Sequence, residues 1–362
     1  MTNKKNVKVW CGLLALFLLT AALIPNVETA GAMALQVPPA EMNGEIAGVY
    51  AITALGSSLD PGIFSDPNVD GIVVRTTWQD TEPQPGQFEW SFIDGEIDRA
   101  TTSGKKVILI VLPGAYTPAW ALDGAQTAIF KSRYGHSQGE DIILPMPWDS
   151  IFYLVRWYDF VSALGERYDS NPTVVMVPAV GPTSISAEMS LPNKPVDVER
   201  WLELGYTKEK YETAWMQTID FYIQAFPSKN ITLTLYPALP IPDRAARKTV
   251  RQDLVEYGVI HYPTQFGIQS SGLTARKAKN TRLGYELVKS YSGIITTGFG
   301  LGTAASSKPR RMGGTDPYQA LLDTVDLGLA AGVKYLVIYE KDILDPVTQP
   351  VIQYAHEQLT GQ

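Results

Sequence analysis

The most constraining feature of this sequence is a repeated alternation of short β-rich runs with helix-like stretches. After Gly44, each run is largely apolar and rich in β-branched residues, as expected for strands that are covered on both faces. Eight strand–helix units in succession predict a parallel sheet, and eight strands are the number that closes into a (β/α)8 TIM barrel. The expected strands are Ile46–Ile52, Gly71–Thr77, Lys106–Leu112, Thr173–Val180, Ile231–Tyr236, Thr264–Gln269, Gly293–Thr297 and Lys334–Tyr339.

Helical patterns separate these runs and mark their own ends. Thr315-Asp316-Pro317 supplies a capping residue and a proline for a first helical turn, and Gly332 ends the same helix. A doubly wound open sheet is the structural rival, but it usually has fewer strands, and no Gly-rich dinucleotide turn follows the first expected strand. The expected helices include Trp148–Tyr168, Lys208–Phe226, Ala275–Tyr291 and Pro317–Ala331.

The amino-acid composition gives no sign of a second domain. The chain has 362 residues, of which 45% are hydrophobic, enough for a large core, and no low-complexity linker divides it. We therefore expect a single barrel domain over residues 40–362. The formal charge of −7 gives no electrostatic reason to bind nucleic acid or an anionic membrane. The oligomeric state is left open.

The first 34 residues have the layout of a secretory signal peptide. Lysines precede the uncharged apolar run Val9–Ile24, and a small-residue stretch ends at Ala34, after which cleavage is expected. The alternative is an uncleaved membrane anchor, although the run falls short of about 18–20 residues. The only cysteine, Cys11, lies in this segment, so the mature protein would have no disulfide or thiolate site. We expect a secreted or otherwise extracytoplasmic protein.

Functional residues of such a barrel are expected in the loops that follow the strands. Those loops are rich in carboxylates and aromatic rings, whereas the only histidines are His136, His261 and His356, at scattered places. Three scattered histidines give little basis for a serine–histidine pair or a histidine metal cluster. We therefore expect neither a metal nor another cofactor. Carboxylates with aromatic platforms suit glycoside hydrolysis, in which one acid protonates the leaving oxygen and a second attacks or activates water.

One segment resembles a known group of enzymes. Residues Gly71–Asp94 carry an arginine on the strand, an aromatic residue, Glu-Pro, a Pro-Gly turn, Phe-x-Trp and an Asp that opens a helix. This pattern resembles the second unit of the clan A barrel glycosidases, which include β-galactosidases and cellulases, and the likeness continues to about residue 190. It implies a glycoside hydrolase and is silent about the substrate. The matching residues are Arg75, Trp78, Glu82, Pro83, Pro85, Gly86, Phe88, Trp90 and Asp94.

Some of these matching residues have a structural interpretation. Glu82-Pro83 is expected to form a corner, and Trp90 is expected to pack on the following helix. Arg75 shares the side-chain parity of Val73 and Thr77, which allows it to point into the barrel. The resemblance implies that such an arginine supports a catalytic carboxylate, and a functional and a structural role both remain open for it.

The expected general acid is Glu188. Clan A enzymes carry Asn-Glu at the end of the fourth strand, whereas this chain has Val180-Gly181-Pro182 there, and Glu188 follows six residues after Pro182. That arrangement is similar to the Gly-Pro…Glu loop that carries the general acid in β-amylase-like barrels. Its neighbours are small and apolar, and desolvation raises the pKa of a carboxyl group towards the value that a general acid needs. The alternative is a solvated loop glutamate.

The second carboxylate is harder to place. Clan A enzymes have their nucleophile at the end of the seventh strand, where Gly298–Gly302 offers no acid. We prefer Glu340 at the end of the eighth strand, with Asp80 and Asp342 in reserve. Tyr339 and Glu340 face opposite sides of a regular strand, so Glu340 can reach the barrel opening only if the chain turns there. The fourth and eighth strands lie across the barrel, which fits the wider spacing of an inverting enzyme better than a direct pair at about 5 Å.

The leading hypothesis is a secreted glycoside hydrolase that acts on a poly- or oligosaccharide. The missing acid on the seventh strand favours a second hypothesis, a carbohydrate-binding barrel that has lost catalysis. A barrel enzyme of another chemistry is a weaker third, because fold does not fix function. The expected substrate-binding residues are Arg75, Trp78, Tyr116, Trp120, Tyr236, Gln269 and Tyr339.

Overall fold

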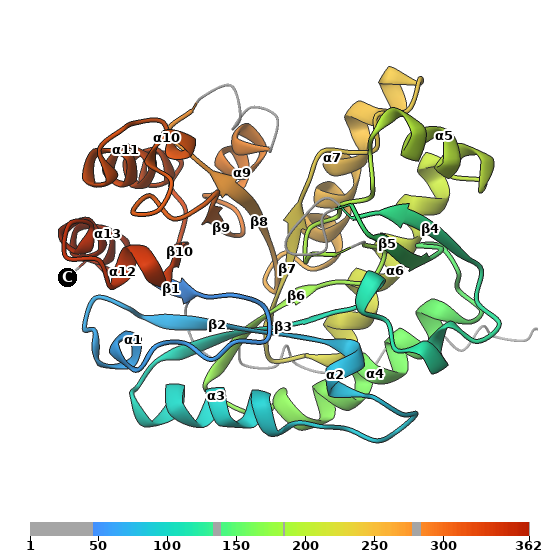
Figure 1. The fold of residues 1–362 in the computed structure, drawn as a ribbon, viewed down its shortest axis with the longest axis horizontal. Coiled ribbons are helices and arrows are strands. Elements are labelled where there is room, and N and C mark those ends of the chain that lie inside the picture. Colours follow the sequence, from blue (N-terminus) through green and yellow to red (C-terminus); the bar gives the residue numbers. More distant parts are fainter. Residues whose placement is uncertain (1–45, 133–138, 184, 277–283, 362) are drawn as a thin grey trace, which may run out of the picture. The chain divides into compact units, whose positions relative to one another are not determined.

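The computed structural model describes residues 46–132, 139–183, 185–276 and 284–361, and all structural statements concern these residues. The expected signal peptide at residues 1–34, with Cys11, and His136 lie outside them. Eight parallel strands form a closed ring, which confirms the predicted (β/α)8 barrel (Figure 1). Each barrel strand pairs with the next barrel strand along the chain. The last one closes the ring against the first, with Gly48 opposite Tyr335.

All eight expected strands are present, with shifts of a few residues at their ends. The shifts are largest in the last third of the chain, where β8 and β9 both extend about four residues beyond the expected end. The barrel strands are β1 (Gly48–Ile52), β2 (Gly71–Thr77), β3 (Lys106–Leu112), β6 (Val174–Ala179), β7 (Asn230–Leu235), β8 (Phe266–Leu273), β9 (Thr296–Leu301) and β10 (Tyr335–Tyr339).

Two tyrosines fill the amino-terminal end of the barrel. The rings of Tyr50 and Tyr335 meet edge to face at 5.9 Å between centroids. Glycines on neighbouring strands make room for them: a Cβ at Gly71 would lie 2.4 Å from the Tyr50 ring, and one at Gly298 would lie 2.2 Å from the Tyr335 ring. Close packing therefore occupies this end of the barrel.

Helices surround the ring of strands, as Figure 1 shows. The predicted helix that starts at Trp148 begins only at Tyr153, after a turn in which Asp149 accepts the backbone N–H groups of Ile151 and Phe152. Part of the predicted helix Ala275–Tyr291 lies outside the described residues, and its last part is α9, Tyr285–Tyr291. The helices that follow barrel strands are α3 (Ser91–Thr102), α4 (Tyr153–Tyr168), α6 (Lys208–Ala225), α7 (Arg244–His261), α9 (Tyr285–Tyr291), α11 (Pro317–Leu329) and α13 (Gln349–Thr360).

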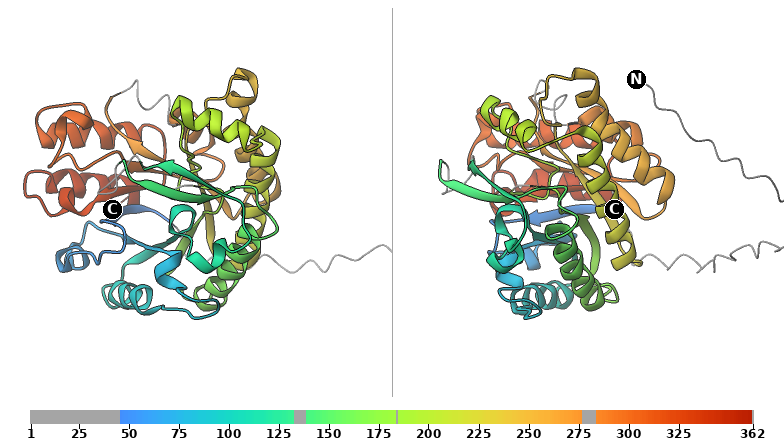
Figure 2. Two further views of the ribbon diagram at one scale, coloured as in Figure 1. Left: turned by 45° about the vertical axis from the view of Figure 1, so that its right-hand side comes forward. Right: turned by 90° about the vertical axis from the view of Figure 1, so that its right-hand side faces the viewer.

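Two insertions interrupt the simple alternation. An antiparallel hairpin of β4 (Thr127–Lys131) and β5 (Asp141–Pro145) follows β3, and α5 (Pro195–Glu203) follows β6. The ring of Phe130 stacks on Trp201 of α5 at 4.4 Å, so the hairpin and α5 support each other outside the barrel (Figure 2). The remaining short helices are α1 (Pro61–Ser65), α2 (Trp78–Thr81), η1 (Gly114–Tyr116), η2 (Ala119–Leu122), α10 (Pro309–Met312) and α12 (Glu340–Ile343).

In the described part of the chain, no helix combines the length and the apolar character that crossing a bilayer requires.

Candidate active site

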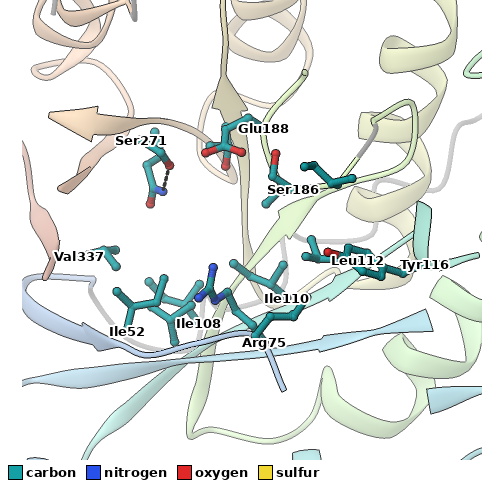
Figure 3. Close-up of a pocket in the computed structure, with 16 residues that line it drawn as sticks. Ile52, Arg75, Ile108, Ile110, Leu112, Tyr116, Ser186, Glu188, Ser271 and Val337 are labelled. Carbon is teal, nitrogen blue, oxygen red and sulfur yellow. Dashed lines mark hydrogen bonds between the residues drawn. The ribbon is translucent and has the colours of Figure 1, made fainter. Parts of the chain in front are cut away.

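A cavity of about 210 Å³ lies inside the barrel, towards the carboxyl ends of the strands. It is bounded by residues of β1, β2, β3, β7, β8 and β10 and by the loop that follows β6 (Figure 3). This is the end of a (β/α)8 barrel at which active sites are built. Most of the lining is aliphatic, and its polar residues are Arg75, Tyr116, Ser186, Glu188, Thr234, Gln269 and Ser271.

Arg75 points into this cavity from β2. Its Nη2 donates a hydrogen bond to the backbone carbonyl of Thr53, whereas its Nε is buried and has no hydrogen-bond partner in the described structure. Burial lowers the pKa of Arg75, and the nearby Tyr339, Glu188 and Tyr116 partly offset this effect. A guanidinium group carries five N–H donors and stays protonated, so most of its binding capacity is unused.

Glu188 approaches the cavity from the opposite side, on the loop after β6 (Figure 3). Its backbone is held firmly: the Thr183 hydroxyl and the Ser190 N–H both donate to the Glu188 carbonyl at 2.6 Å. The following residue, Met189, donates its N–H to the Thr234 carbonyl of β7 at 3.0 Å. These bonds place the half-buried side chain at the cavity mouth and on the same side of the protein as the carboxyl ends of the strands.

Four further polar side chains surround these two. Tyr116 lines the cavity; burial raises the pKa of its phenol, and Arg75 lowers it in part. Gln269 accepts a hydrogen bond from Tyr335 at 3.0 Å and donates one to Ser271 at 3.2 Å. Tyr339 ends β10 and interacts electrostatically with both Arg75 and Glu188, while burial raises the pKa of its phenol. Polar groups from β2, η1, β8 and the loop after β6 therefore line one space, whereas Tyr339, which was expected to bind substrate, is not part of the cavity lining.

The structure places the candidate second carboxylates outside the cavity lining. The chain does turn at Glu340, where β10 ends and α12 begins, and the Glu340 carboxylate accepts hydrogen bonds from the Thr53 hydroxyl and the Asp60 N–H. Since Thr53 also accepts from Arg75, a short polar chain connects Glu340 to the cavity. Asp80 is exposed on α2 and accepts from the Thr77 hydroxyl at 2.5 Å.

Asp342, the reserve candidate, is completely buried. Its carboxylate accepts the backbone N–H groups of Ala305 at 2.8 Å and Ser306 at 2.7 Å, and burial raises its pKa. The side chain thus ties the loop after β9 to α12 and is not part of the cavity lining.

Three expected sugar-binding aromatics also lie elsewhere. Trp78 is 0% exposed, so its ring faces only protein. Trp120 is half-buried; its ring meets that of Trp78 at 5.7 Å, and its Nε1 donates to the Glu82 carbonyl at 3.1 Å. Tyr236 is half-buried just beyond β7. None of the three lines the cavity, whereas Arg75, Tyr116 and Gln269 do.

Most of the motif residues instead build a packed cluster that joins the loop after β2 to α4. We call this cluster the aromatic wall. Neighbouring ring centroids in the wall lie 5.0–6.2 Å apart, with Phe88 stacked on Trp90 and Trp157 stacked on Phe160. Trp90 was expected to pack on the helix that follows it, and its ring contacts lie instead on Phe160 and Tyr168 of α4. The wall consists of Trp78, Phe88, Trp90, Trp157, Phe160 and Tyr168.

Two acidic motif residues fasten the wall. Glu82 is buried and accepts hydrogen bonds at 2.8 Å from the Trp78 Nε1 and from the Gly86 N–H, as expected for a corner, and burial raises its pKa. Asp94 accepts from Arg167 at 2.5 Å and from the Tyr168 hydroxyl at 2.8 Å. The motif that carries the family resemblance is therefore mainly a packing motif.

Sequence reasoning missed Thr53, Thr234, Ser186 and Ser271 as parts of the site. Ser271 reaches the cavity next to a bulge in β8, where pairing with β9 shifts between Ser271 and Leu273 and Gly272 has a φ of 95°. Bulges often redirect side chains next to active sites. The signal available in advance was the Ser-Ser-Gly sequence within an otherwise regular strand.

Within the described ranges, no three His, Cys, Asp or Glu side chains gather closely enough to hold a metal ion. The polar groups of the cavity are hydrogen-bond donors and a single carboxylate, which suits a polar organic ligand.

Comparison with known proteins gives a consistent picture. Residues 68–225 match the β-galactosidase family known as glycoside hydrolase family 42, a segment that contains the aromatic wall, Arg75 and Glu188. No curated protein sequence matches the chain.

Among solved structures, the catalytic domain of β-amylase from Paenibacillus polymyxa is similar, with a TM-score of 0.56, 11% identity and coverage of 89% of this chain and 99% of that one. The β-galactosidase of the psychrophilic Marinomonas ef1 gives a TM-score of 0.51 and 13% identity over 86% of this chain and 59% of its own. The β-galactosidase of Rahnella sp. R3 gives a TM-score of 0.53 and 11% identity, with coverage of 88% of this chain and 56% of that one. At these identities, the likeness establishes the fold, and this chain spans under three fifths of the two β-galactosidases.

The fold, the cavity at the carboxyl ends of the strands and the matched segment lead to one classification. The chain is a (β/α)8-barrel protein whose residues 68–225 are similar to the β-galactosidases of glycoside hydrolase family 42.

Proposed function

We propose that this protein hydrolyses O-glycosidic bonds of an oligo- or polysaccharide in the barrel cavity. The observation that carries the proposal is the position of Glu188, a half-buried carboxyl group that faces Arg75 across a cavity at the carboxyl ends of the strands. A general acid must reach the leaving oxygen while being partly shielded from water, and this position meets both requirements.

In the proposed reaction, protonated Glu188 gives its proton to the glycosidic oxygen as the bond from that oxygen to the anomeric carbon breaks. A water molecule adds to the anomeric carbon and loses a proton to the second carboxylate, so that one bond is cleaved for each water consumed. We assign the second role to Glu340, because it lies on the same rim and is joined to Arg75 through Thr53. Action through water allows the two carboxyl groups to be farther apart than in a direct attack.

Substrate contacts follow from the cavity lining. Arg75, Gln269 and Ser271 can donate hydrogen bonds to sugar oxygens, and Tyr116 offers an aromatic side chain next to them. The aliphatic remainder of the lining would cover the C–H faces of one sugar ring.

A second candidate function is carbohydrate binding without turnover. Of the described residues that line the cavity, Glu188 is the only carboxylate, and a single acid does not complete the hydrolytic pair. The experiment that follows separates the two candidates.

The test is turnover of a panel of oligosaccharides by the wild type and by Glu188→Gln. We expect the variant to keep its melting temperature and to lose about 10²–10⁴-fold in kcat, the contribution typical of a general acid. Glu199→Gln, at an exposed position on α5, is the matched control and should retain full activity. Unchanged turnover in Glu188→Gln would remove this residue from the mechanism, and binding without turnover in the wild type would favour the second candidate.

The assignment of the second carboxylate has its own test. Glu340→Gln should slow turnover strongly, whereas Asp80→Asn should leave it close to wild type, because Asp80 is exposed on α2 and bonded to Thr77. The reverse order of effects would transfer the role to Asp80.

We also propose that the protein acts outside the cytoplasm after removal of residues 1–34. The basic, apolar and small-residue segments of this stretch support the proposal. Amino-terminal sequencing of the exported protein should read from Leu35, and an intact amino terminus in the membrane fraction would indicate the anchor alternative.

A further inference from the structure

Arg75 is a half-buried cation, and most of the binding capacity of its guanidinium is not used by the described residues. Only one hydrogen bond engages its guanidinium, to the Thr53 carbonyl, and the buried Nε has no partner among the described residues. Its immediate surroundings in the cavity are aliphatic, including Val73, Ile108 and Ile110. Burying a charge in such surroundings is costly unless the charge is paired. The cost is unexplained by the fold alone.

The cavity supplies little compensation for this charge. Glu188 is the one carboxylate of the described lining, and it faces Arg75 across the cavity without forming an ion pair with it (Figure 3). Glu340 interacts with Thr53 and Asp60, not with Arg75 itself. The space between Arg75 and Glu188 is therefore where a bound molecule would meet the free N–H groups.

The proposed role of Glu188 makes the imbalance larger. A general acid carries its proton when the substrate is bound, and a protonated Glu188 no longer offsets the positive charge. Arg75 would then be the only charged side chain of the described lining. A ligand that brings its own negative charge would restore neutrality.

We propose that the cavity recognises an acidic sugar, a uronic acid unit whose carboxylate binds the free N–H groups of Arg75. A carboxylate fits because its two oxygens match the planar fork of guanidinium donors, a pairing that is shorter and stronger than a bond to a neutral hydroxyl. This inference deepens the proposed function by naming the substrate class, and it rests on that function for the protonation state of Glu188.

The experiment compares each of three acidic sugars with its neutral counterpart by calorimetric titration of the full-length protein at pH 7. The pairs are glucuronic acid with glucose, galacturonic acid with galactose, and mannuronic acid with mannose. For at least one pair, the acid should bind about tenfold or more tightly, as expected for a hydrogen bond to a charged group. Equal affinities in all three pairs would overturn the inference.

Variants identify the residue responsible. Arg75→Met should reduce the preference for the acid to about twofold or less, since the charge and all donors are lost. Arg156→Met is the matched control, because Arg156 also donates only to backbone carbonyls, those of Ala121 and Asp123, and lies outside the cavity lining. A preference that survives in Arg75→Met, or that disappears in Arg156→Met, would contradict the assignment.

A measurement on the wild type covers the case in which Arg75→Met fails to fold. The methyl ester of the preferred acid keeps the sugar and its shape but removes the charge, so it should bind about as weakly as the neutral sugar. An ester that binds as tightly as the acid would exclude charge recognition by Arg75.

Glu188→Gln separates this inference from the proposed function. The variant should keep the preference for the acid while losing turnover. Preference for the acid with no turnover of acidic or neutral oligosaccharides by the wild type would refute the hydrolase and leave the inference standing. Turnover of neutral oligosaccharides with no preference for the acid would refute the inference and leave the hydrolase standing.

Discussion

The aromatic wall and the barrel cavity lie on either side of β2, yet they are built on opposite principles. In the wall, side chains pack ring against ring. The carboxylates of the two acidic residues that fasten it, Glu82 and Asp94, accept hydrogen bonds from other residues of the protein. In the cavity, Arg75 and Glu188 face each other with donors and acceptors left over. The family match covers the whole wall but ends before β8 and β10. Similarity in sequence therefore reports the scaffold, while the chemistry depends on residues that it covers only in part.

The comparison predicts that the wall carries stability and the cavity does not. Trp78→Ala should lower the free energy of unfolding by about 3–5 kcal/mol, because it removes a fully buried ring from the centre of the wall. Arg75→Met should change it by about 1 kcal/mol or less, since replacing a poorly paired and partly buried charge by an apolar side chain is often neutral or stabilising. Chemical denaturation followed by circular dichroism measures both. Equal losses in the two variants would break the distinction.

The amino-terminal end of the barrel, which Tyr50 and Tyr335 fill, should contribute to stability through its packing, as the wall does. Gly298→Ala is expected to cost about 1–3 kcal/mol, because the new Cβ would lie 2.2 Å from the Tyr335 ring. Two residues further along β9, a Cβ at Gly300 would make contacts of 3.4 Å or longer, to Ser271 and Gln269 beside the cavity. Gly300→Ala should therefore stay within about 0.5 kcal/mol of wild type. A larger loss of stability in Gly300→Ala would mean that the cavity is packed as tightly as the amino-terminal end of the barrel.

The buried acid of the wall predicts a dependence of stability on pH. Burial raises the pKa of Glu82 in the folded protein above its unfolded value of about 4.3, so the folded state holds the proton more tightly. The contribution of Glu82 to the unfolding free energy is then largest below about pH 4 and falls as the pH rises through the raised pKa. The stability of the wild type minus that of Glu82→Gln should show this fall. A difference that rises with pH would mean that the hydrogen bonds from Trp78 and Gly86 outweigh burial.

The smallest effect is expected at the solvent edge of the wall. The Asp94 and Arg167 side chains are 35% and 43% exposed, and ion pairs in such positions are weakened by solvent screening. Asp94→Asn should cost less than about 1 kcal/mol and should lose part of that effect in high salt. Thermal unfolding at two salt concentrations measures this. A loss comparable to that of Trp78→Ala would show that Asp94 belongs to the structural centre of the wall.

Much of the fold could be predicted from local patterns in the sequence. β2 and β3 were predicted to the residue, because each is a short run of mostly buried residues that is rich in β-branched side chains. The β4–β5 hairpin and α5 were not predicted, because their stability comes from mutual packing, shown by Phe130 on Trp201. Propensity alone does not reveal such pairs.

The site could be predicted only in part. Arg75, Tyr116, Glu188 and Gln269 were identified because they lie on or directly after expected strands, and all four line the cavity. Trp78 was expected to bind a sugar but is enclosed by the wall, because the short helix α2 begins at that residue and carries the ring away from the barrel opening. The position of a residue in the chain predicts whether it lies at the rim of the barrel. It does not predict the direction in which the side chain points once the strand has ended.

Sequence by itself determined the eight strand–helix units and the carboxyl-end loops of this protein, because periodicity and β-branching act between near neighbours in the chain. Only the tertiary structure decided which side chains share one space. Glu340 contacts Thr53 across 287 residues of sequence, and Arg75 meets Glu188 only because the strands close into a ring. Barrel closure and strand register set these pairings, and both result from the packing of the whole interior rather than from any local segment.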